Sequence, residues 1–462
     1  MSKLLYGIVF ALAFILVSAN IGYELIDAVS TWNLSNYIKI FKSFGKRIVQ
    51  FDMFTVLLTG GIIGVLYVVL KWLYQLLFVP MNRVRLIEEV GYIREVDRMS
   101  KKDMANLVQK RKNMGKPPPV YPNGWFAVAE SRDLKKGESK SYSILGLDLA
   151  VFRGADGRAH VIDAYCPHLG ANFAIGGRVF DNCIECPFHG WRFSGDDGKC
   201  KKIPYSSKIP ETARVKAYNT LELNGFIYVW YHAEGIEPTW QPPEIEEITK
   251  GQLVFGGRSE HYINAHIEEV PENGADISHL AQVHGPIMAA GVDLRDTYNR
   301  IWEFGKHEWA GEWKQLPEGH IGQLNLTHGL KLFGVHIPVL DMKVQANQIG
   351  PGIVYLTFES SIFGKGCYLQ SLAPVEPMKQ KIVHQVYMHW SVPMCIRKFF
   401  LLGEAIQIER DIMIWNNKKY ESKPVLTGTM EDQMLAKHRR WYKQFYSENS
   451  PTLHQSKKDL SW

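Results

Sequence analysis

Cysteine is scarce in this sequence, which has six cysteines among 462 residues. Small disulfide-stabilised proteins carry a much higher proportion, so disulfides are excluded as the main source of stability. The six are also unevenly spread, because three of them fall within residues 166–186. Thiols clustered in this way in a long chain favour a metal site, and with it a reducing compartment.

A strong excess of charge of one sign is absent as well. The formal net charge is +6, and about +5 of it comes from residues 83–116, where ten Lys and Arg stand against five Asp and Glu. A basic stretch this local favours a membrane surface over a nucleic-acid groove, although a solvated helix face would carry the same charges. We therefore expect no nucleic-acid partner, and the sequence has no internal repeat.

Two long segments lack charge almost completely. Residues 4–23 contain no charged side chain, and residues 54–79 contain one, Lys71. Each segment is long enough to cross about 30 Å of hydrocarbon as a helix. Small residues near the end of the first segment allow a cleaved signal peptide instead. The sequence thus predicts a membrane anchor with one or two transmembrane helices.

The basic residues that flank these segments predict the topology. Arg83 and Arg85 follow the second apolar segment directly, which places residues 80–462 on the cytosolic side. Four basic residues between the two segments oppose this topology if the first segment also spans the membrane. We expect residues 80–462 to face the cytosol from an internal membrane, the endoplasmic reticulum.

Five segments are predicted along the chain. The prolines of GKPPP end a basic amphipathic helix predicted over 82–114. Short β-like runs such as WFAVAE and GFIYVWYH follow, and PTWQPPEIEE precedes β-rich stretches with helical ones near 271–284 and 398–420. The segments are a membrane anchor (1–80), the basic helix with a Pro-rich linker (81–122), a small antiparallel β domain (123–238), an α+β domain (239–425) and a C-terminal helix and tail (426–462).

Two short loops in the β domain each offer one thiolate and one imidazole. CPHLG contains Cys166 and His168, and CPFHGW contains Cys186 and His189, with 17 residues between the pairs. Zinc is one candidate, because Cys₂His₂ sites are common. The alternating ligand types, the Pro and Gly in both loops and the β-like flanks favour a two-iron, two-sulfur cluster with two thiolates on one iron and two imidazoles on the other.

This arrangement resembles the Rieske motif residue for residue. Cys183 does not fit its spacing, so we expect a buried strand thiol there. The first loop, CPHLGANF, has no second cysteine, whereas Rieske proteins of respiratory chains tie their loops with an extra disulfide. The resemblance is therefore to the oxygenase type. The remaining cysteines are expected to be core residues: Cys200, Cys367 and Cys395.

A second candidate metal site lies in ENGADISHLAQVHG, residues 272–285. Asp276 and His279 are three apart and share a helix face. His279 and His284 lie roughly 140° apart on a regular helix, so they converge on one ion only if the helix distorts or ends between them. The Gly-Pro pair that follows His284 is a plausible stop.

A non-haem Fe(II) site needs two histidines and one carboxylate, with open positions left for dioxygen. The carboxylate is expected from QIERDIMIWNNKKY, residues 407–420, and we predict Asp411. Glu409 is the alternative, and because the two are only two residues apart, only one of them should bind. A solvated charged helix is the other interpretation of this segment.

The pattern Asn-x-x-Asp-x-x-His-x₄-His after a Rieske domain resembles the catalytic domain of Rieske oxygenases. The resemblance implies a START-like domain with a helix-flanked antiparallel sheet, so the fold class expected is α+β. It also implies that Asp276 hydrogen-bonds an iron-bound histidine and a cluster histidine of the neighbouring subunit, which requires a homotrimer.

One combination narrows the family further: N-terminal apolar segments, NGADISHL, and ERDIMIWNNKKY. It resembles the Neverland-type cholesterol 7-desaturases of animals and, more distantly, bacterial ketosteroid 9α-hydroxylase. Membrane relatives of the plant type usually end in Cys-x-x-Cys, and the spacing of 28 between Cys367 and Cys395 fits them poorly. The apolar stretch 328–340 is either part of a substrate cavity or a core strand.

The resemblance implies the following activity. A separate NAD(P)H-dependent reductase or ferredoxin supplies electrons, the cluster and a mononuclear Fe(II) use them with dioxygen, and cholesterol becomes 7-dehydrocholesterol in steroid hormone biosynthesis. A membrane-bound Rieske hydroxylase of another steroid or lipid is the first alternative. A non-catalytic Rieske electron carrier is the second.

Overall fold

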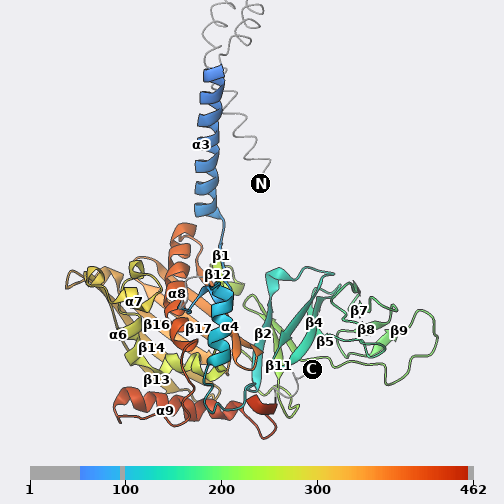
Figure 1. The fold of residues 1–462 in the computed structure, drawn as a ribbon. Coiled ribbons are helices and arrows are strands. Elements are labelled where there is room, and N and C mark those ends of the chain that lie inside the picture. The colour runs from blue at the N-terminus through green and yellow to red at the C-terminus, as the bar shows by residue number, and fades with distance from the viewer. Residues whose placement is uncertain (1–52, 94–98, 456–462) are drawn as a thin grey trace, which may run out of the picture. The chain divides into compact units, whose positions relative to one another are not determined.

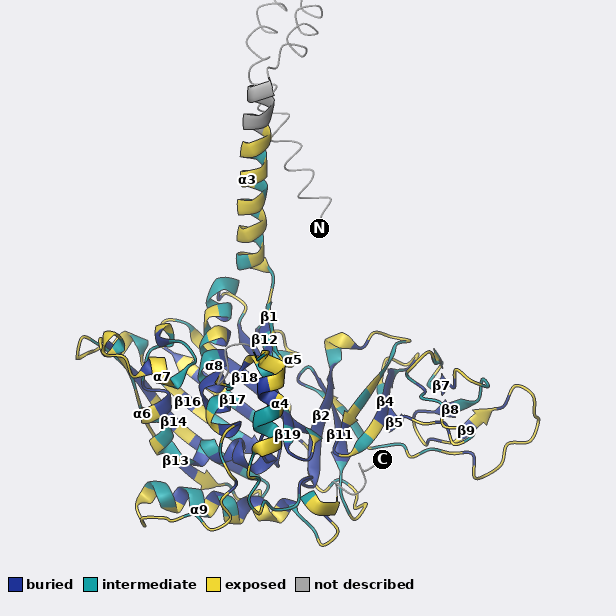
Figure 2. Cartoon of the chain, in the orientation of Figure 1, coloured by how far each residue is buried: buried dark blue, intermediate teal, exposed yellow. Residues whose placement is uncertain are grey.

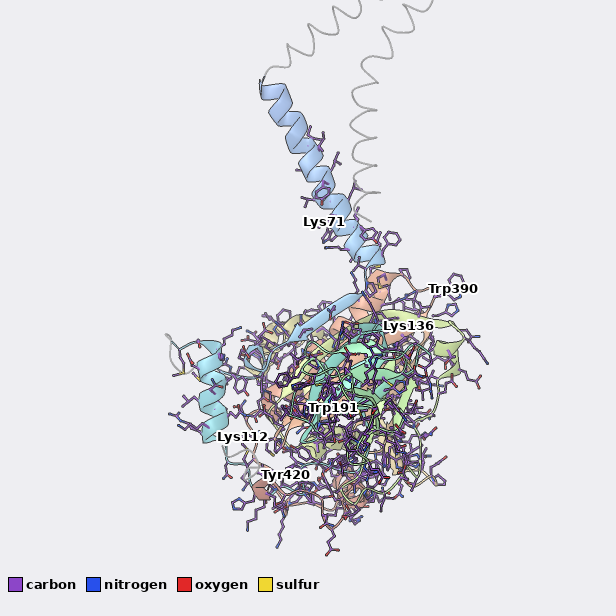
Figure 3. The ribbon with its side chains drawn as sticks, turned by 90° about the vertical axis from the view of Figure 1, so that its right-hand side faces the viewer. Lys71, Lys112, Lys136, Trp191, Trp390 and Tyr420 are labelled. Carbon is purple, nitrogen blue, oxygen red and sulfur yellow. The ribbon has the colours of Figure 1, made fainter. Side chains whose placement is uncertain are left out.

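The computed structural model describes residues 53–93 and 99–455, and the chain divides into two compact units, Met1–Val79 and Pro80–Trp462. In the first unit the described element is helix α3 (Met53–Phe78). Its stretch Gly60–Phe78 is long and apolar enough to cross a membrane, and none of that stretch is buried (Figure 2). Its one charged residue is Lys71 (Figure 3). The first apolar segment of the sequence, 4–23, lies outside the described residues.

The helix predicted over 82–114 was wrong for its first half. Residues Met81–Arg85 form strand β1, which pairs in parallel with β12 at the edge of the large sheet, and a regular helix, α4, covers only Lys101–Arg111. Asn82 and Val84 alternate with two arginines, a period of two that suits a strand. Here the tertiary pairing prevails over the helical pattern, and the Ser100 hydroxyl caps α4 by accepting from the Asp103 amide.

Three small antiparallel sheets form the next part of the second unit, with strand orders β10-β11-β2, β3-β4-β5 and β6-β7-β8-β9. This is the antiparallel β domain predicted from the short β-like runs. Its strands are β2 (Gly124–Glu130), β3 (Ser139–Ile144), β4 (Leu147–Arg153), β5 (Ala159–Asp163), β6 (Arg178–Phe180), β7 (Cys183–Glu185), β8 (Arg192–Ser194), β9 (Cys200–Lys202), β10 (Thr220–Leu223) and β11 (Phe226–Tyr231).

A nine-stranded sheet dominates the rest of the second unit. Its order is β1-β12-β19-β18-β17-β16-β14-β13, with β15 on β14, and every pair except β1–β12 is antiparallel. The strands after β1 are β12 (Leu253–Ile263), β13 (Gly305–Gln315), β14 (Ile321–Leu332), β15 (Val335–His336), β16 (Met342–Ile349), β17 (Ile353–Ser360), β18 (Gly364–Glu376) and β19 (Lys379–His389).

Helices accompany this sheet, so the second unit is α+β as expected. The predicted helical segments 271–284 and 398–420 correspond to α6 and α8. The helices are α5 (Glu246–Thr249), α6 (Ile277–Val283), α7 (Leu294–Thr297), α8 (Met394–Trp415) and α9 (Met430–Tyr442). The short 3-10 turns are η1 (Ile87–Glu89), η2 (Ser131–Asp133), η3 (Ile267–Glu269), η4 (Pro271–Ala275), η5 (Met288–Ala290), η6 (Arg300–Trp302), η7 (Pro338–Leu340) and η8 (Lys443–Phe445).

The two faces of the large sheet have different partners (Figure 1). On one face, called the inner face here, α8 packs on β12 and β19, whereas α6 and α9 pack on β13. On the outer face, Trp125 and Tyr228 of the small β domain form one buried cluster with Tyr355 and Tyr387 of the sheet. Alternation along each strand separates these two sets of side chains. The sheet therefore joins the small β domain to the helices of the α+β domain.

Candidate metal centres

The first pair of predicted ligands lies in two loops of the same shape. In one loop the Gly170 amide donates to the Cys166 carbonyl, and in the other the Gly190 amide donates to the Cys186 carbonyl. Both glycines adopt positive φ, 75° and 71°, which the turn requires. Cys166 and Cys186 are buried, and their thiols contact each other. Burial raises the pKa of Cys166 to about 11, so a thiolate there needs the positive charge of a metal.

The histidines of the two loops also lie together. The rings of His168 and His189 have centroids 4.6 Å apart at 73°, and His168 stacks on Trp191 at 4.6 Å. His168 Nδ1 is buried and has no partner among the described residues. Two thiols, two imidazoles and an unpartnered ring nitrogen fit the mixed ligand set of a Rieske cluster.

The other cysteines stay outside this site. Cys183 lies on β7 and is half-buried, so it is a strand thiol less buried than expected. Cys200 and Cys367 are buried, and Cys395 at the start of α8 is half-buried. All of them are free thiols.

The second predicted site is assembled from α6 and α8. Helix α6 ends at Val283, so His284 stands at its C-cap with φ −102° and ψ 1°, and the rings of His279 and His284 lie 5.0 Å apart. Asp411 on α8 brings its Oδ2 atom to 3.2 Å from His284 Nε2. One ligand atom from each of His279, His284 and Asp411 lies within 4.8 Å of the others. The expected helix end between the histidines is thus confirmed.

Hydrogen bonds orient both imidazoles in the same sense. His279 Nδ1 donates to the Asp276 carbonyl, and His284 Nδ1 donates to Gln407 Oε1 at 2.6 Å. The Nε2 atom of each ring is then turned toward the triad, as in metal-binding histidines whose other nitrogen is held by an acceptor. Asp411 Oδ1 is buried without a partner among the described residues. The residues therefore fit a 2-His-1-carboxylate metal site.

The charges at this site favour a bound cation. Burial lowers the pKa of His279, and the Asp411 carboxylate only partly offsets this effect, so His279 is neutral and can bind a metal. Burial also lowers the pKa of His284, but Asp411 more than offsets it and the net shift is upward. A metal ion bound here would take the place of a proton on His284.

Glu409, the alternative carboxylate, points away from the triad. Its Oε1 accepts from Arg83 at 2.7 Å, from Arg85 at 3.3 Å and from His261 at 3.1 Å, and its side chain is fully buried. Burial raises the pKa of Glu409, but these donors more than offset the effect and lower it to about 2. The carboxylate beside the histidines is Asp411.

Two residues near the triad escaped the sequence reasoning. Gln407 lies four residues before Asp411, and this spacing on one helix face was the signal that could have found it. Arg410 is fully buried and donates to the loop that follows His284. Its acceptors are Gln407 Oε1 and the carbonyls of Val283, Pro286, Ile287 and Gly291.

Asp276, expected to act in electron transfer, caps α6. Its Oδ1 atom accepts from the His279 amide at 3.2 Å, and its side chain is half-buried. The Asp276 carboxylate accepts no other hydrogen bond from the residues that the structure describes. The contact to a cluster histidine of a neighbouring subunit stays a prediction.

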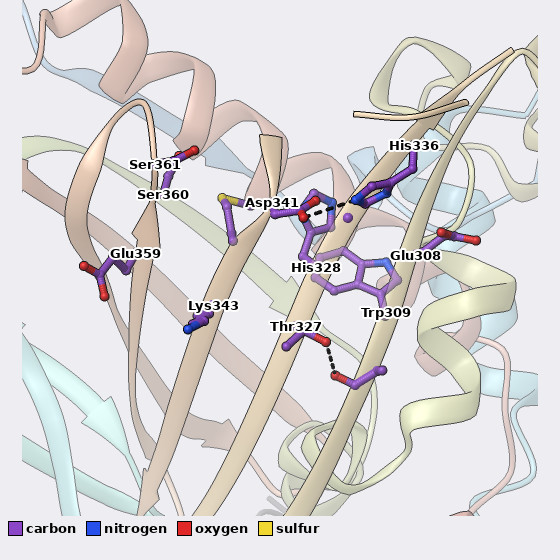
Figure 4. A pocket seen from close by; sticks show the side chains of 13 residues that line it. Glu308, Trp309, Thr327, His328, His336, Asp341, Lys343, Glu359, Ser360 and Ser361 are labelled. Atoms are coloured by element: carbon purple, nitrogen blue, oxygen red, sulfur yellow. Dashed lines mark hydrogen bonds and ion pairs between the residues drawn. The ribbon is translucent and has the colours of Figure 1, made fainter. Parts of the chain in front are cut away.

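A pocket of about 600 Å³ opens at the ends of β13, β14, β16 and β17 (Figure 4). Trp309 and His328 line it together with Met342, and the Trp309 indole lies 3.5 Å from the His284 carbonyl. His328, Gly329 and His336 line the pocket and belong to the apolar stretch 328–340, whose tip is exposed, with Phe333 at 81%. That stretch therefore contributes to the pocket and is not a core strand at its tip.

The inner face of the sheet is apolar beside the triad. The middle strands between α8 and α6 carry aliphatic and aromatic side chains, and several are only half-buried. Partial burial on a face flanked by helices indicates space for an apolar molecule. The half-buried side chains on the strands are Trp309, Met342, Ala346 and Leu356, and those of the adjoining helices α6 and α8 are Ile277, Leu280 and Phe400.

Comparison with known proteins matches two parts of the chain to protein families. Residues 124–218 match the Rieske [2Fe-2S] domain family, and residues 229–446 match the 3-ketosteroid 9alpha-hydroxylase C-terminal domain family. A cholesterol 7-desaturase nvd of Xenopus laevis is 51% identical over 85% of this chain and 86% of its own length. The protein of that name in Drosophila melanogaster is 39% identical over 84% of this chain and 92% of its own length.

The chain belongs to the cholesterol 7-desaturase family of Rieske oxygenases.

More distant relatives of this family member agree with its architecture. The oxygenase component of a 3-ketosteroid-9-alpha-monooxygenase from Rhodococcus rhodochrous is 28% identical over 72% of the chain and 85% of its own length. The structure of Pseudomonas putida CBB5 NdmA with caffeine superposes with a TM-score of 0.53 at 18% identity, covering 69% of this chain and 89% of that one. At that identity the likeness concerns the fold alone.

Proposed function

We propose that the protein desaturates cholesterol between C7 and C8 and yields 7-dehydrocholesterol for steroid hormone biosynthesis. The observation that carries the proposal is the high identity to cholesterol 7-desaturases of other animals over most of both chains, together with the triad of His279, His284 and Asp411. Two hydrogen atoms leave the sterol, and with two electrons from NAD(P)H and two protons from solvent they reduce one dioxygen to two waters.

The metal ligands are proposed residue by residue. Cys166, His168, Cys186 and His189 hold a two-iron, two-sulfur cluster, and His279, His284 and Asp411 hold Fe(II). When bound, the cluster supplies single electrons and the ferrous ion supplies dioxygen activation. Gln407 and the Asp276 carbonyl keep Nε2 of the two histidines aimed at the metal position. The half-buried apolar side chains beside them exclude water and receive the apolar rings of the sterol.

The pocket near Trp309 is the proposed entrance for the substrate. It borders the triad through the contact of Trp309 with the His284 carbonyl, and Trp309 and Met342 belong both to the pocket and to the apolar inner face. Its volume of about 600 Å³ is within the range of small-molecule sites. A START-like helix-flanked sheet would provide this arrangement of pocket and apolar floor.

The domain division proposed is 1–80, 81–122, 123–238, 239–425 and 426–462. The family matches over 124–218 and 229–446 support a boundary between the Rieske and catalytic domains. The apolar helix α3 supports a membrane anchor, and we place the protein at the endoplasmic reticulum with its catalytic part in the cytosol. A separate NAD(P)H-dependent reductase or ferredoxin reduces the cluster.

We also propose a homotrimer. The cluster loops follow β5 and β7 at one end of the Pro80–Trp462 unit, whereas α6 lies at the other end (Figure 1). The loops expose apolar side chains, with Leu169 at 64% and Phe188 at 62%, which suits a surface that contacts another protein. Head-to-tail contact would bring the cluster of one chain to Asp276 and the triad of the next.

The test uses the full-length protein in lipid nanodiscs with a reductase, NADPH and cholesterol. The expected product has lost two hydrogens and carries the ultraviolet absorption of a conjugated diene, and Asp411→Ala should abolish it. A product heavier by one oxygen would instead identify a hydroxylase, and turnover that survives Asp411→Ala would identify an electron carrier acting through another enzyme.

A further inference from the structure

One polar row interrupts the apolar inner face of the large sheet. Ser259 on β12 lies opposite His384 on β19, and His384 lies opposite Gln370 on β18. Next to Ser259 on β12 is the polar His261, which contacts Glu409. The neighbouring inner-face positions on β19 and β18, by contrast, include the apolar Val386 and Leu372. A buried polar group is unfavourable unless it is hydrogen-bonded, so this row needs an explanation.

His384 holds two acceptors in place. Its Nε2 atom lies 2.9 Å from Gln370 Oε1 and 3.5 Å from Glu404 Oε1 on α8. Because both partners are acceptors, Nε2 carries the hydrogen and donates it. Because His384 is 1% exposed, its ring is held by the surrounding core and in turn holds the side chains of Gln370 and Glu404.

The outer atoms of the two partners are left without a protein partner. No hydrogen bond in the described chain uses the Gln370 amide nitrogen or Oε2 of Glu404. The Glu404 side chain is 26% exposed and Gln370 is half-buried, although both lie where α8 faces the sheet. Burial, and then the nearby Glu404 carboxylate, raise the pKa of Tyr368, so that phenol borders the same space. The Gln370 amide nitrogen is therefore a free donor and Glu404 Oε2 a free acceptor, on the inner face on which the apolar, half-buried Leu356 also lies.

The distance from the metal triad is defined by the helix. Glu404 lies seven residues before Asp411 on α8, about two turns, so the two carboxylates share a helix face roughly 10 Å apart along the axis. A rigid molecule whose polar group binds at Glu404 has its reacting atom at the triad only if the distance between that polar group and that atom matches the distance between the two sites.

We propose that Gln370 and Glu404 form a binding subsite for a single alcohol hydroxyl on an otherwise apolar, rigid substrate. The hydroxyl accepts from the Gln370 amide and donates to Glu404, since an alcohol offers one donor and two acceptor positions. The inference rests on the proposed function, in which the ligand is the 3-hydroxyl on the first ring of cholesterol and the oxidised carbon is on the second ring. This hydroxyl contact fixes which carbon faces the triad.

The experiment measures binding, not turnover. Full-length protein in nanodiscs, anaerobic and without reductase, is titrated with cholesterol and with 5-cholestene, the same molecule without the hydroxyl. We expect the wild type to bind cholesterol about 10- to 100-fold more tightly, as loss of a hydrogen bond to a charged or amide partner predicts. Gln370→Met and Glu404→Met should each remove most of that preference and leave the affinity for 5-cholestene within about twofold.

Two further variants separate this role from a structural one. Glu404→Gln keeps an acceptor oxygen of the same shape and should retain most of the preference, whereas Glu404→Met should not. The matched controls are Gln345→Met and Glu312→Met, which lie on outward, exposed positions of β16 and β13. Folding of every variant is verified by the visible spectrum of its Rieske cluster.

Equal affinity of the wild type for both sterols would overturn the subsite, as would variants that weaken both sterols alike. The proposed function is judged separately, from the product of the complete reaction. A preference for the hydroxyl without 7-dehydrocholesterol formation would retain the subsite and reject the desaturase.

Discussion

At the scale of single residues, two carboxylates of α8 that stand two positions apart have opposite roles. Asp411 faces His284 with one oxygen unpartnered, whereas Glu409 faces Arg83 and His261. We expect Asp411→Ala to lose the mononuclear iron while its two-iron, two-sulfur cluster remains. Glu409→Gln should keep all the iron and lose stability, because two arginines lose a buried anion. Iron and labile-sulfide analysis with a thermal melt distinguishes them, and iron loss in both variants would contradict the assignment.

A buried carboxyl away from the triad predicts a pH effect on stability. Burial, and then the neighbouring Glu272, raise the pKa of Glu268 to about 7, from 4.5 in water. Its contribution is therefore present below pH 4.5 and is lost as the pH rises through 7. Glu268→Gln, which still accepts from the Tyr420 hydroxyl, should stabilise the protein at pH 8 by up to about 3 kcal/mol and not at pH 5. Thermal melts at both pH values measure this, with the exposed Glu303→Gln as control.

The residues that the structure brings together at the two candidate sites were predictable, because their spacing in the sequence restricts them. Cys166, His168, Cys186 and His189 follow a loop pattern that few sites share, and His279 with His284 needed only a helix end between them. The partners Gln407 and Arg410 were not predicted, because glutamine and arginine on a helix are usually solvated. Only the tertiary contact of α8 with α6 gives these two a role, and the one sign of it in the sequence is the four-residue spacing of Gln407 and Asp411 on one helix face.

At the scale of elements, Arg410 ties α8 to the loop that carries His284. Its fully buried guanidinium donates to four backbone carbonyls, those of Val283, Pro286, Ile287 and Gly291. Arg410→Met should destabilise the protein by about 3 kcal/mol or more, since each orphaned buried carbonyl costs about 1–3 kcal/mol. It should also release the mononuclear iron more readily on dialysis against a chelator.

The control for this variant is Arg440→Met, an exposed arginine on α9. It should change neither the melting temperature nor the rate of iron release. An Arg410→Met protein with wild-type stability and iron retention would show that the loop is held by other contacts.

The elements were foreseen unequally from the sequence. Strands of the β domain, α6 and α8 were predicted near their observed places because local pattern and burial agree there. Strand β1 was mistaken for helix, because its two arginines look like a solvated basic face. Both arginines in fact contact a buried carboxylate more than 300 residues away in the chain, at separations of 326 and 324. Contacts between residues so far apart in the chain determine that this segment forms an edge strand, and a local sequence pattern does not reveal them.

At the scale of the whole molecule, the candidate cluster loops beside β7 and β8 lie at one side of the Pro80–Trp462 unit, and helix α6 with His279 lies at the other (Figure 1). If electrons cross between chains, two damaged chains can complement each other. Cys166→Ser removes the cluster and Asp411→Ala removes the iron triad, so each protein alone should be inactive. Co-expressed chains should regain a substantial fraction of the activity, because some neighbours combine an intact cluster with an intact triad.

The same experiment has a clear contrary outcome. If electrons move only within one chain, the mixture stays as inactive as either variant. Native mass spectrometry of the detergent-extracted protein provides the independent measurement, and we expect three times the chain mass of 52.8 kDa. A monomer would contradict the homotrimer directly.

Strand β1 also determines how far the protein can be shortened. It begins at Met81, two residues beyond Val79, where the first unit ends, and its arginines neutralise Glu409, two positions from Asp411. A water-soluble version cut before Pro80 keeps that neutralisation. Trimming the chain instead to the proline-rich linker would remove Arg83 and Arg85 and leave the buried Glu409 carboxylate without their charges. It would also remove β1 from the edge of the sheet, next to α8. A loss of activity in that shorter protein would come from the missing strand β1 and not from the missing membrane.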